Sequence, residues 1–312
     1  MASLNTNVSA MTALQTLSAT NKNLATTQSR ISTGFRVGEA ADNAAYWSIA
    51  TTMRSDNKTL STVQDALGLG AGRIDVAYTG MNAAIEVVDE IKAKLVAALG
   101  VSDDDREKIQ AEIKELQQQL KGIADSATFS GSNWLSVETS AANHATAGTH
   151  DDVEIVSAFN RDNSGAISIG TITIDVEGIK LFDADAAGAG LLDAEFTLTD
   201  SATDVSVFTL DITRADVTDA DITDMINEVD DALKAMTTAA SDLGAAKKRV
   251  DMQADFVSKL QDAIDRGVGQ LVDADMQAES ARLSALQVQQ QLGIQSLSIA
   301  NGNAQNILAL FN

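Results

Sequence analysis

The residues of this sequence best suited to chemistry are two histidines and a short stretch that contains closely spaced aspartates. His144 and His150 are its only histidines, and no His-Glu-x-x-His spacing accompanies them, so a zinc-protease helix is not supported. Residues 183–188 are similar to the start of a calcium-binding loop, but Ala187 and Ala194 stand where two ligands would be required. We interpret both stretches as solvated loops.

A glycine cluster and an acidic triplet also lack the surroundings that catalysis needs. Gly68, Gly70 and Gly72 have the wrong spacing for a dinucleotide-binding loop and follow a helical pattern, so we interpret them as a point of local helix flexibility. Residues 103–105, all aspartates, suit the first turn of a helix, where carboxylates interact favourably with the helix dipole. We expect a protein that is not an enzyme and that needs no cofactor or metal.

Composition narrows the class of protein further. The 312 residues include no proline, which favours long uninterrupted helices, and no cysteine, which excludes disulfides and thiol catalysis and leaves the redox compartment open. Aromatic residues make up 4% of the chain, which suits narrow helical bundles better than a thick core. The formal net charge of −22 argues against binding to nucleic acid or to an anionic membrane surface.

Neither a membrane span nor a secretory signal is predicted. No stretch approaches the roughly 18 consecutive apolar residues that a span requires, and the N-terminus lacks a basic region before its apolar residues. These features fit a cytoplasmic protein as well as one exported without a cleaved signal, so composition leaves the localisation open.

The two ends of the chain are alike and carry no charged side chain over residues 1–21 and 283–312. Both nevertheless show apolar residues at helical spacings of three, four and seven. We expect the ends to pair with each other and then to be buried among copies of the same protein, because an unpaired charge would be costly there. The predicted assembly interface consists of Leu4, Val8, Met11, Leu14, Leu17, Leu24, Ile31, Leu283, Leu286, Ile294, Leu297, Ile307, Leu308 and Phe311.

Between these ends the pattern predicts helices, a strand-rich excursion and a return to helix. We expect a first helix over 1–33, a long helix of about 54 residues with Asp42 as its N-cap, a shorter antiparallel helix opened by a capping box at Ser102, and a last long helix from Thr218. The apolar seam of the 54-residue helix is expected to start at Tyr46 and Ile49.

Strands are expected over residues 153–159, 167–176, 195–199 and 205–213, where apolar and polar residues alternate. Residues 138–216 hold fifteen acidic and three basic residues, which indicates a small exposed β-rich domain. The predicted fold class is mainly α, with long antiparallel coiled-coil helices from both chain ends and this domain inserted mid-chain.

Six short motifs occur in the two helical parts of the chain: Leu4–Asn7, Arg30–Val37, Ala40–Ala45, Ala124–Gly131, Val272–Glu279 and Ala304–Phe311. In this order they resemble the motifs of bacterial flagellins, and the resemblance covers roughly residues 1–137 and 217–312. Asn43 stands where a second Asp is usual, Tyr46-Trp47 replaces a glycine-containing pair, and Asn303-Ala304 replaces a proline-containing step, which points to an α-proteobacterial type.

The resemblance implies a subunit that is exported unfolded through the flagellar type III apparatus and polymerises into an extracellular propeller filament. It implies an inner domain (1–40 with 270–312), a helical core domain with a short β-hairpin after its second helix (41–137 with 217–269) and an outer domain (138–216). The partners it implies are further copies of the chain, sister flagellins, hook-associated junction and cap proteins, and an export chaperone.

Two sets of residues take roles from the resemblance alone. Asp89 and Glu90 stand where flagellins recognised by the animal innate-immune flagellin receptor carry a Gln-Arg pair, which implies weak recognition of this chain. The inter-domain spoke comprises Gly34, Arg36, Gly38, Asp42, Asn43, Asp273, Asp275 and Glu279.

Three other readings remain open at this point. Heptad seams by themselves are typical of an ordinary coiled-coil scaffold. A hook–filament junction protein of the same superfamily would share the terminal helices but occur in few copies, and an acidic surface adhesin would work through its β-rich domain.

Deletions separate these readings. Removal of residues 283–312 should abolish polymerisation while the β-rich region keeps its circular dichroism signal, and removal of 138–216 should leave polymer formation intact. Loss of polymer after the second deletion alone would favour the β-rich region as the working part.

Overall fold

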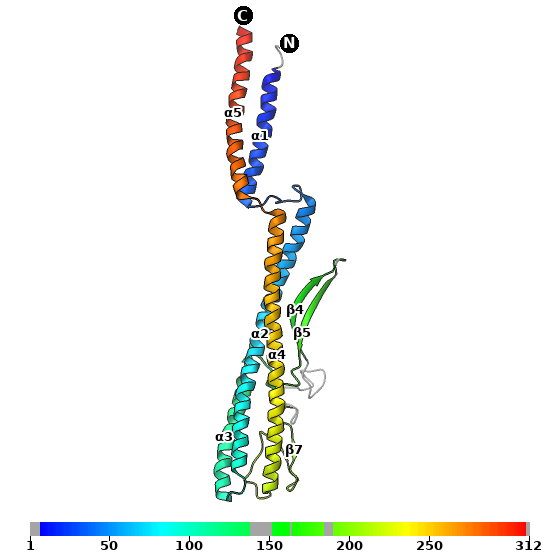
Figure 1. Ribbon diagram of the computed structural model, residues 1–312, viewed down its shortest axis with the longest axis vertical. Coiled ribbons are helices and arrows are strands. Elements are labelled where there is room, and N and C mark those ends of the chain that lie inside the picture. Colours follow the sequence, from blue (N-terminus) through cyan, green and yellow to red (C-terminus); the bar gives the residue numbers. More distant parts are fainter. Residues whose placement is uncertain (1–6, 138–151, 163, 184–189, 310–312) are drawn as a thin grey trace. The chain divides into compact units, whose positions relative to one another are not determined.

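The computed structural model describes residues 7–137, 152–162, 164–183 and 190–309, with side chains up to Gly302, and is mainly helical (Figure 1). The expected fold class is confirmed, because long helices from both ends flank a small strand-containing region. The helices are α1 (Val8–Thr33), α2 (Ala44–Ala97), α3 (Asp103–Ser126), α4 (Asp219–Val272) and α5 (Met276–Ala309).

The strands of the described residues form four two-stranded sheets. Three are antiparallel: β1 (Thr128–Phe129) with β2 (Ser132–Asn133), β4 (Val153–Arg161) with β5 (Ile167–Ile174), and β7 (Phe196–Thr197) with β8 (Asp204–Val205). The fourth pairs β3 (Ser136–Val137) with β6 (Phe182–Asp183) in parallel. The β4–β5 hairpin is the longest, and its register shifts at a bulge between Val156 and Ala158.

The chain divides into two compact units. The terminal unit comprises residues 1–58 and 260–312, and the central unit comprises residues 59–259. The described strands belong to the same compact unit as α3 and most of α2 and α4.

The central unit has a core of small and aliphatic side chains. The predicted seam of α2 is buried from Leu60 to Ala98, and the matching seam of α4 is buried from Ile222 to Leu243. The start of the predicted α2 seam is wrong, because Tyr46 and Ile49 are 42% and 49% exposed. A helix of 54 residues needs a partner along its whole length to bury one stripe, and at these two positions the described residues cover each side chain only in part.

Two predicted helix starts differ in detail from the structure. Asn43, not Asp42, caps α2, because its side-chain oxygen accepts the Tyr46 N–H at 3.2 Å, while the Asp42 carboxylate accepts the N–H groups of Gly38 and Glu39. Ser102 precedes α3 as expected, but its hydroxyl donates to the Asp105 carboxylate, so no capping box forms.

Three of the four predicted strand segments contain strands, and the fourth is wrong beyond its first residue. Residues after Val205 turn back on themselves, yet Val207, Leu210 and Ile212 are buried. Glutamine side chains of α3 replace a partner strand: Gln117 donates to the Val207 and Leu210 carbonyls at 3.2 Å, and Gln110 accepts the Ile212 N–H at 3.0 Å. Alternating apolar residues therefore mark burial here, not a strand.

The N-terminus of α4 is tied to the β7–β8 turn by one buried carboxylate. Asp221 and Thr218 form a reciprocal capping box, and the other oxygen of Asp221 accepts the N–H groups of Asp200 and Ser201. Burial by itself raises the pKa of Asp221, but these N–H donors and the Thr218 hydroxyl outweigh it and hold the pKa below its usual value. The contact therefore stabilises the fold above the ordinary Asp pKa and is lost as the pH falls through the lowered value.

Three glycines of α2 are sites of close packing, which corrects the interpretation of Gly70 and Gly72 as part of a flexible point. A Cβ atom on Gly70 would lie 2.6 Å from Ile155 of β4, one on Gly72 would lie 2.9 Å from Phe129, and one on Gly80 would lie 2.7 Å from Leu135. The missing side chains form notches that receive Phe129, Leu135 and, from the β-rich segment, Ile155. Deleting residues 138–216 would remove the Ile155 contact at Gly70 and keep the Phe129 and Leu135 contacts, so we expect the deletion to destabilise the helical layer where Gly70 lies.

A pair of glycine substitutions tests these notches. Gly70→Ala should destabilise the central unit by about 1–3 kcal/mol, because Ile155 cannot move away without disturbing the hairpin. The matched control is Gly68→Ala in the same helix, where a Cβ meets nothing within 4 Å and should stabilise the helix by roughly 0.5–1 kcal/mol. Urea unfolding followed by circular dichroism measures both, and equal effects would contradict the packing role of Gly70.

Candidate assembly interface

The helices α1 and α5 pack along one regular seam (Figure 1). On each helix, the side chains that are buried or half-buried alternate by steps of three and four, and most side chains between them are exposed. The α1 side consists of Ala10, Ala13, Leu17, Thr20, Leu24, Thr27 and Ile31, and the α5 side consists of Glu279, Leu283, Leu286, Gln290, Gly293, Leu297 and Ala300. We call these residues the inner seam.

Polar contacts connect the two helices at the end, the middle and the base of the seam. The Asn7 side chain donates to the Ala300 carbonyl at 3.0 Å, and Gln290 donates to the Asn21 side chain at 2.9 Å. Arg30 pairs with Glu279 at 3.2 Å. Thr20 tolerates burial because its hydroxyl donates to the Thr16 carbonyl at 2.9 Å. The seam is thus a narrow contact in which leucines are interspersed with small and polar residues.

A second set of apolar side chains on the same helices lies outside the seam. Their exposed fractions run from 54% to 66%, which is high for large apolar residues. They are Val8, Met11 and Leu14 on α1, and Val288, Leu292, Ile294 and Ile299 on α5. We call them the outer stripe. A shallow depression of about 380 Å³ adjoins it, lined by Leu14, Leu17, Ser18, Asn21, Lys22 and Ala25.

The residues predicted as one interface fall into two groups. The inner seam contains Leu17, Leu24, Ile31, Leu283, Leu286 and Leu297, whereas Val8, Met11, Leu14 and Ile294 lie in the outer stripe. Leu4 and Phe311, and the side chains of Ile307 and Leu308, lie outside the described residues. Sequence reasoning missed the small and polar seam residues of α1 and three members of the outer stripe, Val288, Leu292 and Ile299. Steps of three and four residues taken alternately from Leu17 in both directions along the sequence would have predicted the seam residues of α1.

The predicted spoke residues lie where the two chain segments leaving α1 and α4 run side by side. Phe35 and Asp273 form an antiparallel bridge, the Arg36 and Val37 N–H groups donate to the Val272 carbonyl, and the Ala274 N–H donates to Gly34. Gly34 has a φ of 77°, which a residue with a Cβ rarely adopts, so it ends α1 and turns the chain into this ladder.

Other spoke residues hold the ends of this ladder. The Arg36 guanidinium donates to the Leu271 carbonyl at 2.9 Å, and Asp275 caps α5 by accepting the N–H groups of Gln277 and Ala278. Gly38 and Asp42 are joined by the hydrogen bond that closes the loop before α2. A small core supports the ladder, with Val37, Ala50, Val268 and Val272 buried.

Glu279 is the charged member of the inner seam. It is 8% exposed, it pairs with Arg30 at 3.2 Å and with Arg282 at 3.6 Å, and its second oxygen is buried without a hydrogen-bond partner. Its position in the first turn of α5 and that of Arg30 in the last turn of α1 suit both helix dipoles. A carboxylate held this way anchors the base of the helix pair.

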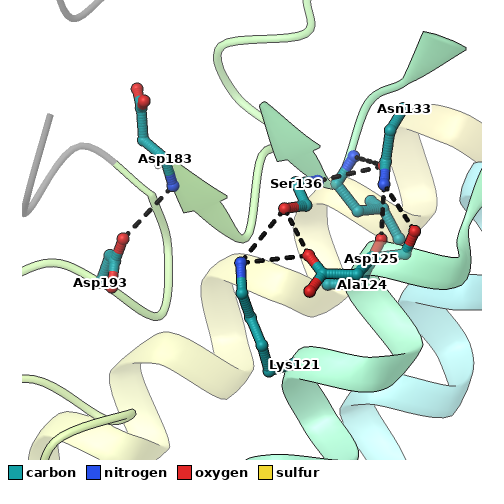
Figure 2. Close-up of polar contacts among 8 residues, drawn as sticks. Lys121, Ala124, Asp125, Asn133, Ser136, Asp183 and Asp193 are labelled. Atoms are coloured by element: carbon teal, nitrogen blue, oxygen red, sulfur yellow. Dashed lines mark hydrogen bonds and ion pairs between the residues drawn. The ribbon is translucent and has the colours of Figure 1, made fainter. Parts of the chain in front are cut away.

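One cluster in the central unit has residue types that could do chemistry. Figure 2 shows Ser136 donating to Asp125 at 2.7 Å, with Lys121 3.1 Å from Asp125 and 3.3 Å from Ser136. The Lys121 nitrogen also lies 4.8 Å from the centroid of the Phe182 ring, so the three polar side chains join the end of α3 to β3 and β6. The cluster is therefore structural.

Asn133 completes the same cluster. Its side-chain nitrogen donates to the Ala124 carbonyl at 2.7 Å at the end of α3, and its oxygen accepts the Leu135 and Ser136 N–H groups (Figure 2).

In the part of the chain that the structure describes, no group of three or more His, Asp or Glu side chains could hold a metal ion. Within the same residues no helix is long and apolar enough to cross a membrane.

A helical chain whose ends pair through a narrow seam and expose a second apolar stripe free of charge has the design of a self-assembling structural subunit. The sequence matches the bacterial flagellin N-terminal helical region over residues 4–140 and the C-terminal helical region over 226–311. The chain belongs to the bacterial flagellin family and is a subunit of the flagellar filament, an extracellular structural protein without enzymatic activity.

Curated relatives agree over the whole length. Flagellin C of Rhizobium meliloti (strain 1021) is 49% identical, with 100% of this chain and 99% of the relative covered. Flagellin of Brucella melitensis biotype 1 is 49% identical at the same coverage, and Flagellin A of Rhizobium meliloti (strain 1021) is 42% identical with both chains fully covered. The expected α-proteobacterial type is confirmed by these relatives.

Removing the ion pair tests the anchor at the base of the helix pair. Glu279→Ala should weaken local stability by about 1–3 kcal/mol, because Arg30 loses its partner, and amides at the start of α5 should exchange roughly 5- to 150-fold faster. Arg282→Ala, which changes a 60% exposed side chain, is the control and should change little. Hydrogen exchange with mass spectrometry measures both, and unchanged exchange in Glu279→Ala would refute the anchor.

Proposed function

We propose that this flagellin buries its two apolar surfaces in two stages. The inner seam closes within the subunit, and the outer stripe closes only between copies in the filament. The observation that carries this proposal is the high exposed fraction of the outer-stripe side chains, 54–66%. These side chains lie in the two segments without charged side chains, residues 1–21 and 283–312. Exposed apolar groups of this kind mark interaction sites.

The physical chemistry of the stripe favours a repeating contact. A filament needs heterologous contacts that do not close on themselves, so the same surface meets a different surface of the next copy. Any charge in that contact would be stacked once per subunit along the filament and would have to be desolvated. Thr, Ser, Asn and Gln side chains allow close approach without that cost.

The domain division and the finer partners follow from the family. We assign 1–40 with 270–312 to an inner tube, 41–137 with 217–269 to the layer around it, and 138–216 to the outer surface. Sister flagellins, hook-associated junction and cap proteins, and the export chaperone and apparatus are the proposed partners. The acidic outer segment keeps filaments apart by repulsion between like charges.

Two alternatives are less well supported. Full-length similarity to curated flagellins favours the filament subunit over a hook–filament junction protein. The β-rich segment is hydrogen-bonded to α3 through Gln110 and Gln117 and to α4 through Gln253, which donates to the Ser157 carbonyl at 2.9 Å. These contacts favour a role in the scaffold over an independent adhesin module.

Substitution of the outer stripe tests the two-stage proposal. The double variant Leu292→Gln and Ile299→Gln should raise the critical concentration for polymerisation at least about tenfold, because each side chain loses part of the roughly 1.5–3 kcal/mol that its burial would contribute. Exchange of the seam amides in the monomer should stay unchanged. Sedimentation and negative-stain microscopy after salt-induced assembly give the readout.

The matched control lies in the inner seam. Leu286 is 8% exposed, so Leu286→Ala should speed exchange of the seam amides in the monomer as well as weaken assembly. Polymerisation of the double variant at the wild-type critical concentration would show that the outer stripe is not a contact between copies.

Two acidic residues of α2 bear on recognition by the animal flagellin receptor. Asp89 and Glu90 are exposed neighbours on α2, where they present two negative charges in place of a polar and a basic side chain. We expect weak receptor activation by purified monomer, and stronger activation by the Asp89→Gln, Glu90→Arg variant, in a reporter-cell assay. Strong activation by the wild-type monomer would refute this prediction.

A further inference from the structure

We propose that Asn301 and Gly302 form a deamidation site that is protected while α5 is helical and reacts when the end of α5 opens. The site would limit the time during which an unassembled subunit stays competent for polymerisation. This inference rests on the proposed role of the terminal helices as contacts between copies.

The reaction needs only water. The backbone nitrogen of Gly302 attacks the side-chain carbonyl carbon of Asn301, a C–N bond forms, and the side-chain amide nitrogen leaves as ammonia with the displaced proton. Water then adds to either carbonyl of the resulting succinimide and opens it to aspartate or isoaspartate. A glycine makes the attack easy because it has no Cβ to hinder the approach and can adopt backbone angles closed to other residues.

The position of this dipeptide is unusual within the chain. Residues 301–302 are the single Asn-Gly pair of the whole sequence, and they lie inside the tract 283–312 that carries no charged side chain. Asn303 is followed by alanine and Asn306 by isoleucine, so the same helix contains two asparagines whose following side chain hinders the reaction. Asn303 and Asn306 therefore serve as internal references for the deamidation rate of Asn301.

Helical structure protects the pair, and its place in α5 makes that protection weak. In an α-helix the amide nitrogen is committed to the carbonyl four residues earlier and cannot reach its neighbour's side chain. Asn301 is exposed, and it follows Ala300, which accepts the hydrogen bond from Asn7 directly before α1 begins at Val8. The pair therefore lies at the end of the inner seam.

Opening at this end costs little. Gly302 is less favourable than alanine in a helix interior, and helical segments with few buried contacts open first. Burial of the outer stripe, including Ile299 at 66% exposure in the free subunit, would hold this end of α5 helical in the polymer. Protection should then be strong in the filament and weak in the monomer.

The products would oppose assembly. Aspartate places a negative charge in a tract without charge, and that charge would repeat once per subunit along the filament. Isoaspartate also adds a methylene group to the backbone, which breaks the helical repeat. A subunit that waits too long before assembly would be excluded from the filament, whereas an assembled one would be preserved.

Peptide mapping by mass spectrometry tests the chemistry. We expect Asn301 of the wild-type monomer to deamidate at least about tenfold faster than Asn301 of the polymer under the same buffer, because local opening sets the rate. In the monomer, Asn301 should react faster than Asn303 and Asn306, and Gly302→Ala should slow it. Equal rates in monomer and polymer, or a rate at Asn301 no higher than at Asn303, would overturn the inference.

An assembly assay tests the consequence. Asn301→Asp should raise the critical concentration at least about tenfold, by adding a charge that the contact would have to desolvate. The control Asn160→Asp adds the same charge at an exposed position of β4 and should assemble like the wild type. Wild-type assembly by Asn301→Asp would overturn the inference and leave the outer-stripe proposal standing, because only the Leu292 and Ile299 variants test that proposal.

Discussion

A pair of helices can bury only one stripe of each partner, and this limit governs the terminal unit. α1 and α5 meet along a single seam in which Leu residues are interspersed with Ala, Thr, Gln and Gly, so little apolar area is hidden within the subunit. The remaining large apolar side chains have no place in that seam and stay exposed. A structure of this kind reaches its full stability only when copies of it come together, which couples the order of the ends to polymerisation.

Charge is distributed in keeping with the same limit. The chain carries a formal net charge of −22, of which residues 138–216 contribute fifteen acidic and three basic side chains, while both ends carry none. The charge that the inner seam does contain, Glu279, lies at its base and is neutralised by Arg30. Repulsion is thereby kept away from the surfaces that must meet.

The central unit compensates for its scarcity of aromatic residues by close approach and by side-chain hydrogen bonds. Glycines of α2 admit Ile155, Phe129 and Leu135, and glutamines of α3 satisfy backbone groups of the segment after β8. Such contacts join the β-rich segment to the helices without a large sheet. The segment is consequently part of one compact unit with α3, although its composition differs sharply from that of the helices.

The sequence alone determined the long helices, their approximate ends and the pairing of the two termini, because heptad spacing, the lack of proline and the glycines at helix ends act locally. It also led to the family through short motifs at both ends. Tertiary structure decided which apolar residues of α1 and α5 face each other. Met11 and Leu17 are both large apolar residues of α1, and only the position of α5 makes Leu17 half-buried and leaves Met11 exposed. It likewise decided that Asn43 caps α2, that Gly70 is a packing notch and that residues 206–213 turn without forming a strand, because each outcome depends on an atom contributed by a neighbouring or distant segment.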